Sequence, residues 1–538
     1  MCRCESQKLR SIHCYRVRGK DLAADIDTSI RADLRAQFAS TAQASYDVLT
    51  RPCSKEHSIA GQFVSSRSDQ GEIMTDSPWL GDACSLVDAF RAGDHSPAEE
   101  LEATLNAIER SETNSFSFVD AESARAQAAA ADLGKPFGGV PFGIKELSHY
   151  KGWPDTEASL VFADRVSDRT ETMLERAEML GGVIPVGLTT ASEFGGLNVS
   201  VTKLNGVTRN PWQLDRTAGG SSGGSSAAVA GGLLTMATGG DGGGSIRIPA
   251  GFNGLPGMKG TAGRIPRGPK ALIHPMTVVL GVMCRSIRDI TRYFDVTAGY
   301  DSRDPYSLPK VSGWEHHLGS HLGALRGRKV AIVSDLGSAV VNPAVTELVN
   351  EAGRLLADEV GLEIVHVDLA FPSMGFEWAL GNLSGLYADL EGLWPECKDQ
   401  LTPEIAFGMS IAERKYSLAM MARSETARTA ANEAVASAFD QVDFIFSATN
   451  PDVAFPAETT LHLEVAGQPV GPENNGALTI PYNIVGNPSL SVPIGQLDGL
   501  PVGMQIASRH HQDALVLDLG LALERSRPWP LVANAAPC

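Results

Sequence analysis

Short apolar runs alternate with helix-like patterns from residue 136 onward, and this alternation restricts the fold of the chain more than any other feature. The runs 140–144, 183–188 and 330–333 predict strands, and the segments 171–181 and 342–357 predict helices. Strands that alternate with helices are typical of the α/β class. We therefore expect an α/β fold.

The part of the chain after residue 73 behaves as one unit. No Pro/Ser-rich linker and no repeat of fixed period divides 74–538, so a single large domain is favoured. Within it, the less patterned stretch 301–445 is expected to lie over the surface of the domain as a variable substrate-pocket region. Ser96 opens a capping box with proline at the first helical position, which predicts a helix there.

The first 73 residues differ from the rest. They hold 11 basic and 9 acidic side chains and four of the eight cysteines of the chain. Patterning typical of a folded protein begins at Met74. We expect 1–73 to be a flexible extension or a non-native start before translation from Met74, and a regulatory or partner-binding arm is the alternative.

The composition excludes several classes of protein. Of the 538 residues, 43% are hydrophobic and 20% charged, which excludes a disordered chain and a multi-span membrane protein. The net charge of −18 works against binding nucleic acid. No secretion signal or apolar run of membrane-spanning length is visible, so we expect a cytoplasmic protein that acts on a small molecule and not at a membrane. Cys2 and Cys4 beside His13 have the only metal-like spacing, and reduced thiols are the default.

Glycine and serine gather in residues 218–263 around a small apolar run. The buried-type flank 227–237 argues against a flexible linker, and the segment lacks the Gly-Lys-Ser/Thr ending of a phosphate loop. Glycines allow consecutive backbone N–H groups to converge on one point. We therefore predict an oxyanion hole, with Ser245 as the nucleophile beside amides from Gly242, Gly243, Gly244 and Ser245 itself.

A serine nucleophile needs a base, and this segment offers no histidine. There is also no Gly-x-Ser-x-Gly elbow here. A lysine can serve where burial lowers its pKa enough to keep it neutral, and Lys145 ends an apolar run suited to that. Taken alone, a lysine at a strand end is more often a surface charge.

The order of the motifs closely resembles that of the amidase signature family, and the resemblance covers essentially 74–538. The matching segments are Lys145 after its apolar run, 208–212, 216–220, Gly-Gly-Ser-Ser-Gly-Gly-Ser at 219–225, Asp-Gly-Gly-Gly-Ser-Ile-Arg-Ile-Pro-Ala at 241–250, 481–488 and 499–505. The resemblance implies a single domain with a central mixed β-sheet covered by helices.

The resemblance also implies a Ser-cisSer-Lys triad. Carried over by motif position, Ser245 is the nucleophile, Ser221 is the bridging residue with a cis peptide to Gly220, and Lys145 is the base. The base, the nucleophile and the oxyanion donors would all come from the chain. No metal or organic cofactor is therefore required.

Other residues near the nucleophile agree with the family or depart from it. Asp241 and Arg247 flank Ser245, and we expect them to pair and support the loop. Glycine stands at Gly240, where the family often has threonine, and Glu146 stands in place of the commoner aspartate. The usual Gly-Leu-Lys-Pro segment is changed at 257–260. None of these departures removes a member of the triad.

The segment 371–425 is the best candidate for a pocket wall. Its large apolar and aromatic side chains include Met374, Phe376, Trp378, Leu383, Leu386, Tyr387, Trp394 and Met409. The alternative for each of them is an ordinary core residue. Together they favour a bulky apolar or aryl substrate.

The predicted function is hydrolysis of amides, and also of esters and carbamates (urethanes), by a monomer or homodimer. The alternative is the glutamine-hydrolysing amidase subunit of a tRNA-dependent amidotransferase, which would need a partner and a polar pocket. A third hypothesis, a catalytically inactive binding protein, is disfavoured by the complete triad.

Overall fold

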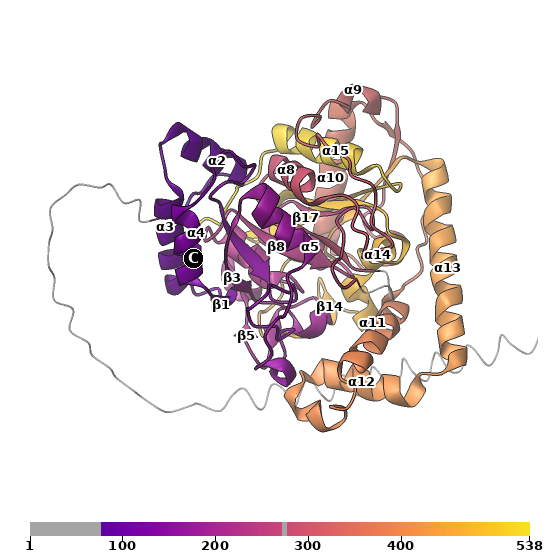
Figure 1. Ribbon diagram of the computed structural model, residues 1–538. Helices are drawn as coiled ribbons and strands as arrows, with labels where there is room; N and C mark the ends of the chain where they lie inside the picture. Colours follow the sequence, from indigo (N-terminus) through magenta and orange to yellow (C-terminus); the bar gives the residue numbers. More distant parts are fainter. Residues whose placement is uncertain (1–76, 272–276, 538) are drawn as a thin grey trace, which may run out of the picture. The chain divides into compact units, whose positions relative to one another are not determined.

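One mixed sheet runs through the part of the chain that this computed structural model describes, residues 77–271 and 277–537 (Figure 1). Its strand order is β1 (Phe116–Val119), β3 (Ile184–Thr189), β2 (Pro141–Lys145), β8 (Met236–Asp241), β10 (Val279–Cys284), β9 (Gly257–Lys259), β16 (Ser489–Leu497), β17 (Leu500–Ser508), β13 (Phe444–Ala448), β11 (Lys329–Ile332) and β12 (Glu363–Ile364). The sheet contains parallel and antiparallel neighbours, and β2 runs parallel to both β3 and β8. The predicted α/β fold with a mixed sheet is confirmed.

Helices pack around this sheet (Figure 1). They are α2 (Ala83–Ala92), α3 (Pro97–Arg110), α4 (Ala121–Ala129), α5 (Thr172–Arg176), α6 (Gly223–Ala230), α7 (Arg247–Asn253), α8 (Ile287–Thr297), α9 (Leu322–Leu325), α10 (Pro343–Val360), α11 (Gly375–Asp389), α12 (Pro403–Lys415), α13 (Leu418–Gln441), α14 (Ile480–Val485) and α15 (Asp513–Ser526). Small two-stranded pairs stand apart from the main sheet: β4 (Val201–Thr202) with β5 (Gly206–Val207), β6 (Arg209–Asn210) with β7 (Gln213–Thr217), and β14 (Glu464–Val465) with β15 (Gln468–Pro469).

The predicted elements agree with the observed ones to within a few residues. The three predicted strands are β2, β3 and β11, and every residue of β2 and β3 is buried. Such continuous burial is expected of parallel strands covered on both faces. The predicted helix 342–357 is α10, whereas the segment 171–181 begins as α5 and ends in a turn of π-helix at Ala177–Gly181.

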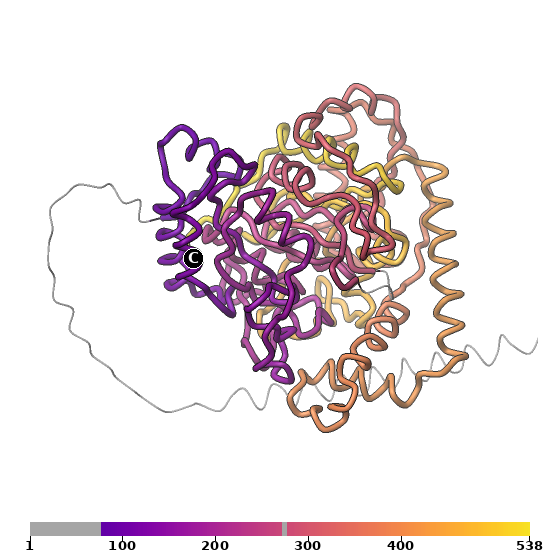
Figure 2. Tube along the Cα trace, viewed as in Figure 1, coloured from indigo at the N-terminus to yellow at the C-terminus, as the bar shows by residue number. Residues whose placement is uncertain are grey.

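The capping box at Ser96 is present. Its hydroxyl accepts a hydrogen bond from Glu99 N, and Ser96 N donates to the Glu99 carboxylate at 2.8 Å. The described residues belong to one compact unit. The C-terminal tail beyond α15 returns to α6, where Ala533 N donates to the carbonyl of Ala230 at 2.7 Å (Figure 2). The predictions made for 1–73 lie outside the described residues.

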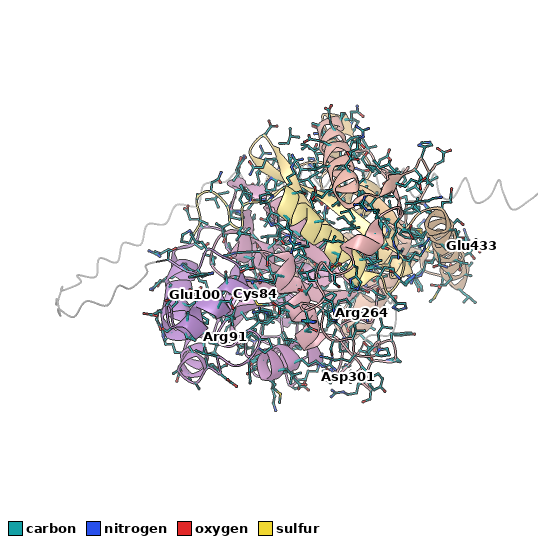
Figure 3. All side chains as sticks on the ribbon, turned by 90° about the horizontal axis from the view of Figure 1, so that it is seen from above. Cys84, Arg91, Glu100, Arg264, Asp301 and Glu433 are labelled. Atoms are coloured by element: carbon teal, nitrogen blue, oxygen red, sulfur yellow. The ribbon has the colours of Figure 1, made fainter. Side chains whose placement is uncertain are left out.

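The stretch 301–445 does not have a single role. It supplies β11, β12 and α10, which belong to the sheet and its cover, and also α11, α12 and α13, which lie beyond one end of the sheet (Figure 1). The first turns of α13 are exposed, and Leu418 is 87% accessible. Seen from above, Glu433 of α13 lies on the side opposite Cys84 and Glu100 of α2 and α3 (Figure 3). No helix of the described chain is long and apolar enough to cross a membrane.

Candidate active site

Lys145 is the last residue of β2 and is only 3% exposed. Its backbone N–H donates to Thr238 Oγ1 on the neighbouring strand β8 at 2.7 Å. The side-chain Nζ donates to Ser221 Oγ at 2.8 Å and to the carbonyl of Gly240 at 3.2 Å. The strand end therefore places the predicted base against the predicted bridging serine.

The environment of Lys145 favours the neutral amine. Burial lowers the pKa of Lys145 from 10.5 to about 7, and the carboxylates of Asp241, Glu157 and Glu171 offset part of that effect. A neutral amine has a lone pair that can accept a proton, so this side chain can act as a base near neutral pH.

We expect kcat/KM for hydrolysis to fall about tenfold per pH unit below the pKa of Lys145, because protonation removes the base. With that pKa at about 7, activity should be full at higher pH and lost as the solution becomes acidic. A profile of kcat/KM from pH 5 to 9 checks this. A flat profile down to pH 5 would contradict a lysine base.

A second buried lysine makes a control necessary for that profile. Burial also lowers the pKa of Lys259 to about 7, but its Nζ donates to the carbonyls of Asn487 and Gly260 and not to Ser221. In a Lys259→Met variant that folds, the acidic limb of the profile should remain at the same pH. If the limb moves or disappears, it belongs to Lys259.

Ser221 lies in the tight turn before α6. The peptide bond between Gly220 and Ser221 is cis, as the resemblance implies. The turn packs against the backbone of Val199, and a Cβ on Gly220 would lie 2.6 Å from Val199 N. Only glycine fits position 220 without moving that backbone.

Ser245 lies in the loop between β8 and α7 and is 8% exposed. Its carbonyl accepts a hydrogen bond from Ser222 N at 3.3 Å, so the two serine segments lie side by side. Its hydroxyl makes no hydrogen bond with another described residue. The structure thus brings the segments of Lys145, Ser221 and Ser245 together where the neighbouring strands β2 and β8 end.

The carbonyls of the glycine loop are held by surrounding groups. The carbonyl of Gly242 accepts from Trp378 Nε1 at 2.7 Å, and that of Gly243 accepts from Thr479 Oγ1 at 2.6 Å. In a trans peptide the C=O and the next N–H point in opposite directions. These contacts therefore fix the directions of the N–H groups that follow.

One of the predicted oxyanion donors is already engaged. Gly244 N donates to Asp241 Oδ1 at 2.8 Å, so this amide is not available to an oxyanion. The N–H groups of Gly242, Gly243 and Ser245 make no hydrogen bond with another described residue. Gly244 is held with φ +130°, and a Cβ there would lie 2.5 Å from Thr479 Oγ1, so its own role is to allow the bend of the loop.

Asp241 and Arg247 form a fully buried pair beneath the loop. The Arg247 Nε and Nη2 atoms donate to the two Asp241 oxygens at 2.9 Å each. Burial alone would raise the pKa of Asp241, but the Arg247 guanidinium holds it well below its usual range. Arg247 also donates to Gln505 Oε1 and Asn483 Oδ1. The pair ties the loop to β17 and α14.

The predicted pocket residues lie in different surroundings. Trp378 of α11 contacts the glycine loop directly. Met374 is buried against Ala431 and Ile480, whereas Phe376 and Tyr387 are 40% and 48% exposed. Trp394 packs with the apolar cluster of α11 and α12.

Sequence reasoning missed several groups at the site. Thr479 and Asn483 bind the backbone of the loop, and the only signal for Asn483 was its place in the 481–488 motif. Gly195 was also missed, and a Cβ there would lie 3.5 Å from Ser221 Oγ. Gly195 therefore lines the space beside the bridging hydroxyl.

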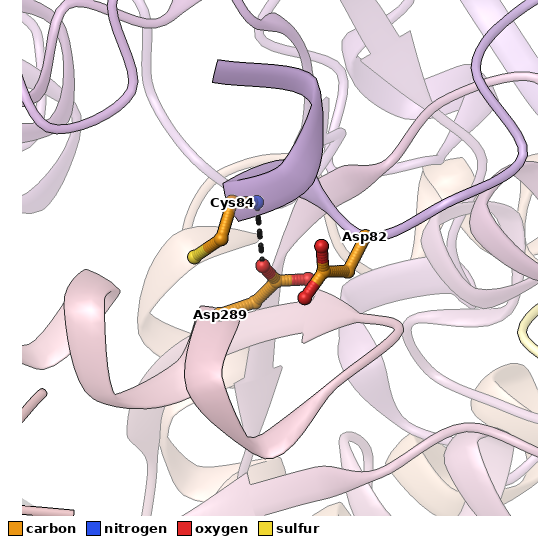
Figure 4. Close-up of side chains that lie close together, drawn as sticks. All are labelled: Asp82, Cys84 and Asp289. Atoms are coloured by element: carbon orange, nitrogen blue, oxygen red, sulfur yellow. Dashed lines mark hydrogen bonds between the residues drawn. The ribbon is translucent and has the colours of Figure 1, made fainter. Parts of the chain in front are cut away.

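Asp82, Cys84 and Asp289 form one cluster of metal-ligating side chains among the described residues (Figure 4). The two Asp289 oxygens accept from Cys84 N at 3.0 Å and Ala83 N at 3.2 Å. Burial raises the pKa of the Cys84 thiol far above its usual value. A carboxylate that accepts from backbone N–H groups, next to a thiol that stays protonated, suits a helix cap better than a metal site.

His149, Asp155 and Glu157 form a second such cluster. Here His149 Nδ1 and Asp155 Oδ1 share a hydrogen bond of 2.8 Å, and Arg165 Nε lies 3.1 Å from Asp155 Oδ2. Arg165 and the His149 ring already satisfy this carboxylate. The predicted metal-like spacing of Cys2, Cys4 and His13 lies outside the described residues.

A pocket of about 580 Å³ lies elsewhere, between residues 308–321 and α15. Arg264 lines it, and this residue is labelled in Figure 3. None of the predicted catalytic residues contributes to its wall. The pocket is therefore separate from the site around Ser245.

Known proteins with similar sequences include an acylamidase and an amidotransferase subunit. The family model described as Amidase matches residues 99–517. An acylamidase of Rhodococcus erythropolis is 31% identical over 468 residues, which cover 84% of this chain and 96% of that protein. A glutamyl-tRNA(Gln) amidotransferase subunit of Chloroflexus aggregans is 29% identical, over 82% of this chain and 95% of that protein.

Two solved structures also resemble this chain. A bacterial aryl acylamidase of the amidase signature family superposes with a TM-score of 0.78 and 27% identity, over 84% of this chain and 97% of that chain. A 6-aminohexanoate cyclic dimer hydrolase in complex with its substrate superposes with a TM-score of 0.76 and 25% identity, over 85% and 99%.

Proposed function

This chain belongs to the amidase signature family of amide-bond hydrolases, and from that membership we propose that it cleaves amides of bulky apolar or aryl substrates through a Ser245–Ser221–Lys145 triad. The observation that carries the proposal is the 2.8 Å contact between Lys145 Nζ and Ser221 Oγ, made by a lysine whose pKa lies at about 7. A lysine with its usual pKa would be protonated and could not serve as a base.

The first half of the reaction forms an acyl-enzyme. Ser245 Oγ attacks the carbonyl carbon of the amide, and its proton passes through the Ser221 hydroxyl to Lys145. When the tetrahedral intermediate collapses, the C–N bond breaks. The proton returns through Ser221 to the nitrogen, and the amine leaves.

The second half consumes water. A water molecule loses a proton by the same route to Lys145 and attacks the acyl carbon. The bond from that carbon to Ser245 Oγ then breaks, the proton returns through Ser221 to Ser245 Oγ, and the acid is released. In both halves the carbonyl oxygen becomes negative. The N–H groups of Gly242, Gly243 and Ser245 are the proposed donors to it.

The proposed substrate class is an anilide, a fatty amide or an aryl carbamate. Trp378 lies against the glycine loop, and Phe162 and Phe194 pack edge to face in the cluster of α11 and α12. Apolar and aromatic surface of this kind favours a substrate with an apolar body. Esters and carbamates pass through a similar tetrahedral intermediate, so we expect them to be cleaved as well.

A substrate panel tests this proposal. Release of the amine is measured from an aryl anilide, a fatty amide, an aryl carbamate and glutamine, with the purified full-length chain. We expect turnover of the apolar members and little of glutamine. A Ser245→Ala protein at equal folded concentration is the blank.

The competing function is that of an amidotransferase component, which the similarity to the glutamyl-tRNA(Gln) amidotransferase of Chloroflexus aggregans supports. Turnover of glutamine alone, or turnover only after a partner is added, would replace our proposal with that one. Mass measurement in solution with and without the added partner also separates them, because we propose a monomer or homodimer that does not enter a larger assembly.

A further inference from the structure

Trp378 joins the helix α11 to the glycine loop that precedes the nucleophile. Its Nε1 donates to the carbonyl of Gly242 at 2.7 Å. The indole also covers Gly243, where a Cβ would lie 2.9 Å from Trp378 Nε1. Among the described residues of 371–445, no other side chain has a hydrogen bond to the loop 242–245.

The indole is held in place by its own neighbours. Trp378 N donates to the carbonyl of Met374 at 2.9 Å, which anchors the first turn of α11. The ring packs against the small apolar cluster of Met374, Ala431 and Ile480. Its direction is therefore set by the packing of α11 on α13 and α14.

The bond from Trp378 fixes one peptide plane of the loop. With the carbonyl of Gly242 directed at the indole, the N–H of Gly243 must point the opposite way. That N–H makes no hydrogen bond with another described residue. It remains available for an oxygen that gains negative charge.

The other peptide planes of the loop are held by elements other than α11. The carbonyl of Asp241 accepts from Asn483 Nδ2 at 2.8 Å, and that of Gly244 accepts from Ile248 N at 2.7 Å. These contacts come from α14 and α7. Among the described residues 241–245, only the Gly242 plane is held from α11.

We propose that Trp378 is a positioning residue for the oxyanion hole, which holds the Gly242 carbonyl so that the Gly243 N–H is aimed at the oxygen formed when Ser245 attacks. The inference rests on the proposed function. On this inference, Trp378 contributes to kcat and not only to substrate binding. Donors stabilise a transition state best when they are oriented in advance.

Trp378→Phe tests the inference, because it removes the indole N–H and keeps an aromatic ring. We expect kcat to fall about 10- to 100-fold with KM changed less than about 3-fold, since loss of a whole oxyanion donor costs about 10²–10³ in kcat. The affinity of a trifluoromethyl ketone, which forms an oxyanion on the serine, should fall by the same factor as kcat/KM.

Trp529→Phe is the matched control. Trp529 Nε1 donates to the carbonyl of Arg285 at 3.1 Å in the core, so the chemical change is the same. We expect its kcat to be unchanged. Thermal unfolding of both variants shows whether either change alters the folded population.

The outcomes separate the inference from the function on which it rests. A higher KM with unchanged kcat in Trp378→Phe makes Trp378 a binding residue alone and overturns the inference, while hydrolysis by the wild type still supports the triad. Equal losses of kcat in the two variants also overturn it. If the wild type shows no hydrolysis that depends on Ser245, the proposed function fails and the inference fails with it.

Discussion

Replacing Ser245 by alanine should lower kcat/KM for an aryl anilide by at least about 10⁴-fold, because it removes the proposed nucleophile that forms the acyl-enzyme. The Ser245 hydroxyl has no hydrogen bond to another described residue, so its removal leaves no buried partner unsatisfied. The protein should therefore fold as before. Initial rates of amine release, measured with thermal unfolding of the same samples, check both parts.

Covalent labelling shows whether Ser245 itself is the reactive residue. A fluorophosphonate should label the wild type on the peptide that contains Ser245, as seen by mass spectrometry, and should not label the variant. Ser526→Ala is the control, since this serine ends α15 and bonds only to carbonyls of its own helix. A Ser245→Ala protein that keeps a tenth or more of the activity would remove Ser245 from the mechanism.

Replacing Arg247 by methionine should lower the free energy of unfolding by about 3–5 kcal/mol, since it leaves the Asp241 carboxylate buried without its positive partner. Both side chains of the pair are fully buried. Activity should also be lost, because the same carboxylate binds the N–H of Gly244 and shapes the nucleophile loop. Urea unfolding at pH 7 gives the free energy.

The exposed pair Arg125–Glu102 provides the comparison. Its N–O distance is 2.6 Å, but the side chains are 53% and 38% exposed. Solvent screens such a pair, so Arg125→Met should cost only about 0–1 kcal/mol. Equal losses of unfolding free energy in the two variants would contradict the larger contribution of the buried pair.

The sequence was enough to predict the α/β class and three strands of the sheet, whereas the triad remains a prediction that the family resemblance implies. Continuous apolar runs predicted β2, β3 and β11 to within one residue, because strands covered on both faces have no alternating pattern to confuse them. Lys145 is buried against Ser221 in the structure, although its position at a strand end alone favoured a surface charge.

The contacts that orient the loop could not be predicted in the same way. Thr479 lies 236 residues from Gly243, and no local pattern indicates that a hydroxyl so distant binds that carbonyl. The glycine pattern also could not show that Asp241 takes the Gly244 amide. Composition indicated aromatic side chains near 371–425 but not which face of α11 meets the site, so Trp378 and Phe376 were indistinguishable.

The strand order has a consequence for how this site forms. Lys145 meets Ser221 across 76 residues of chain, and Asn483 reaches Asp241 across 242. Contacts between such distant segments form slowly and late, since closing long loops costs entropy before the contacts compensate for it. After dilution from denaturant, far-UV signals of the local helices should thus return before hydrolysis does, and recovered activity reports that these long-range contacts have formed.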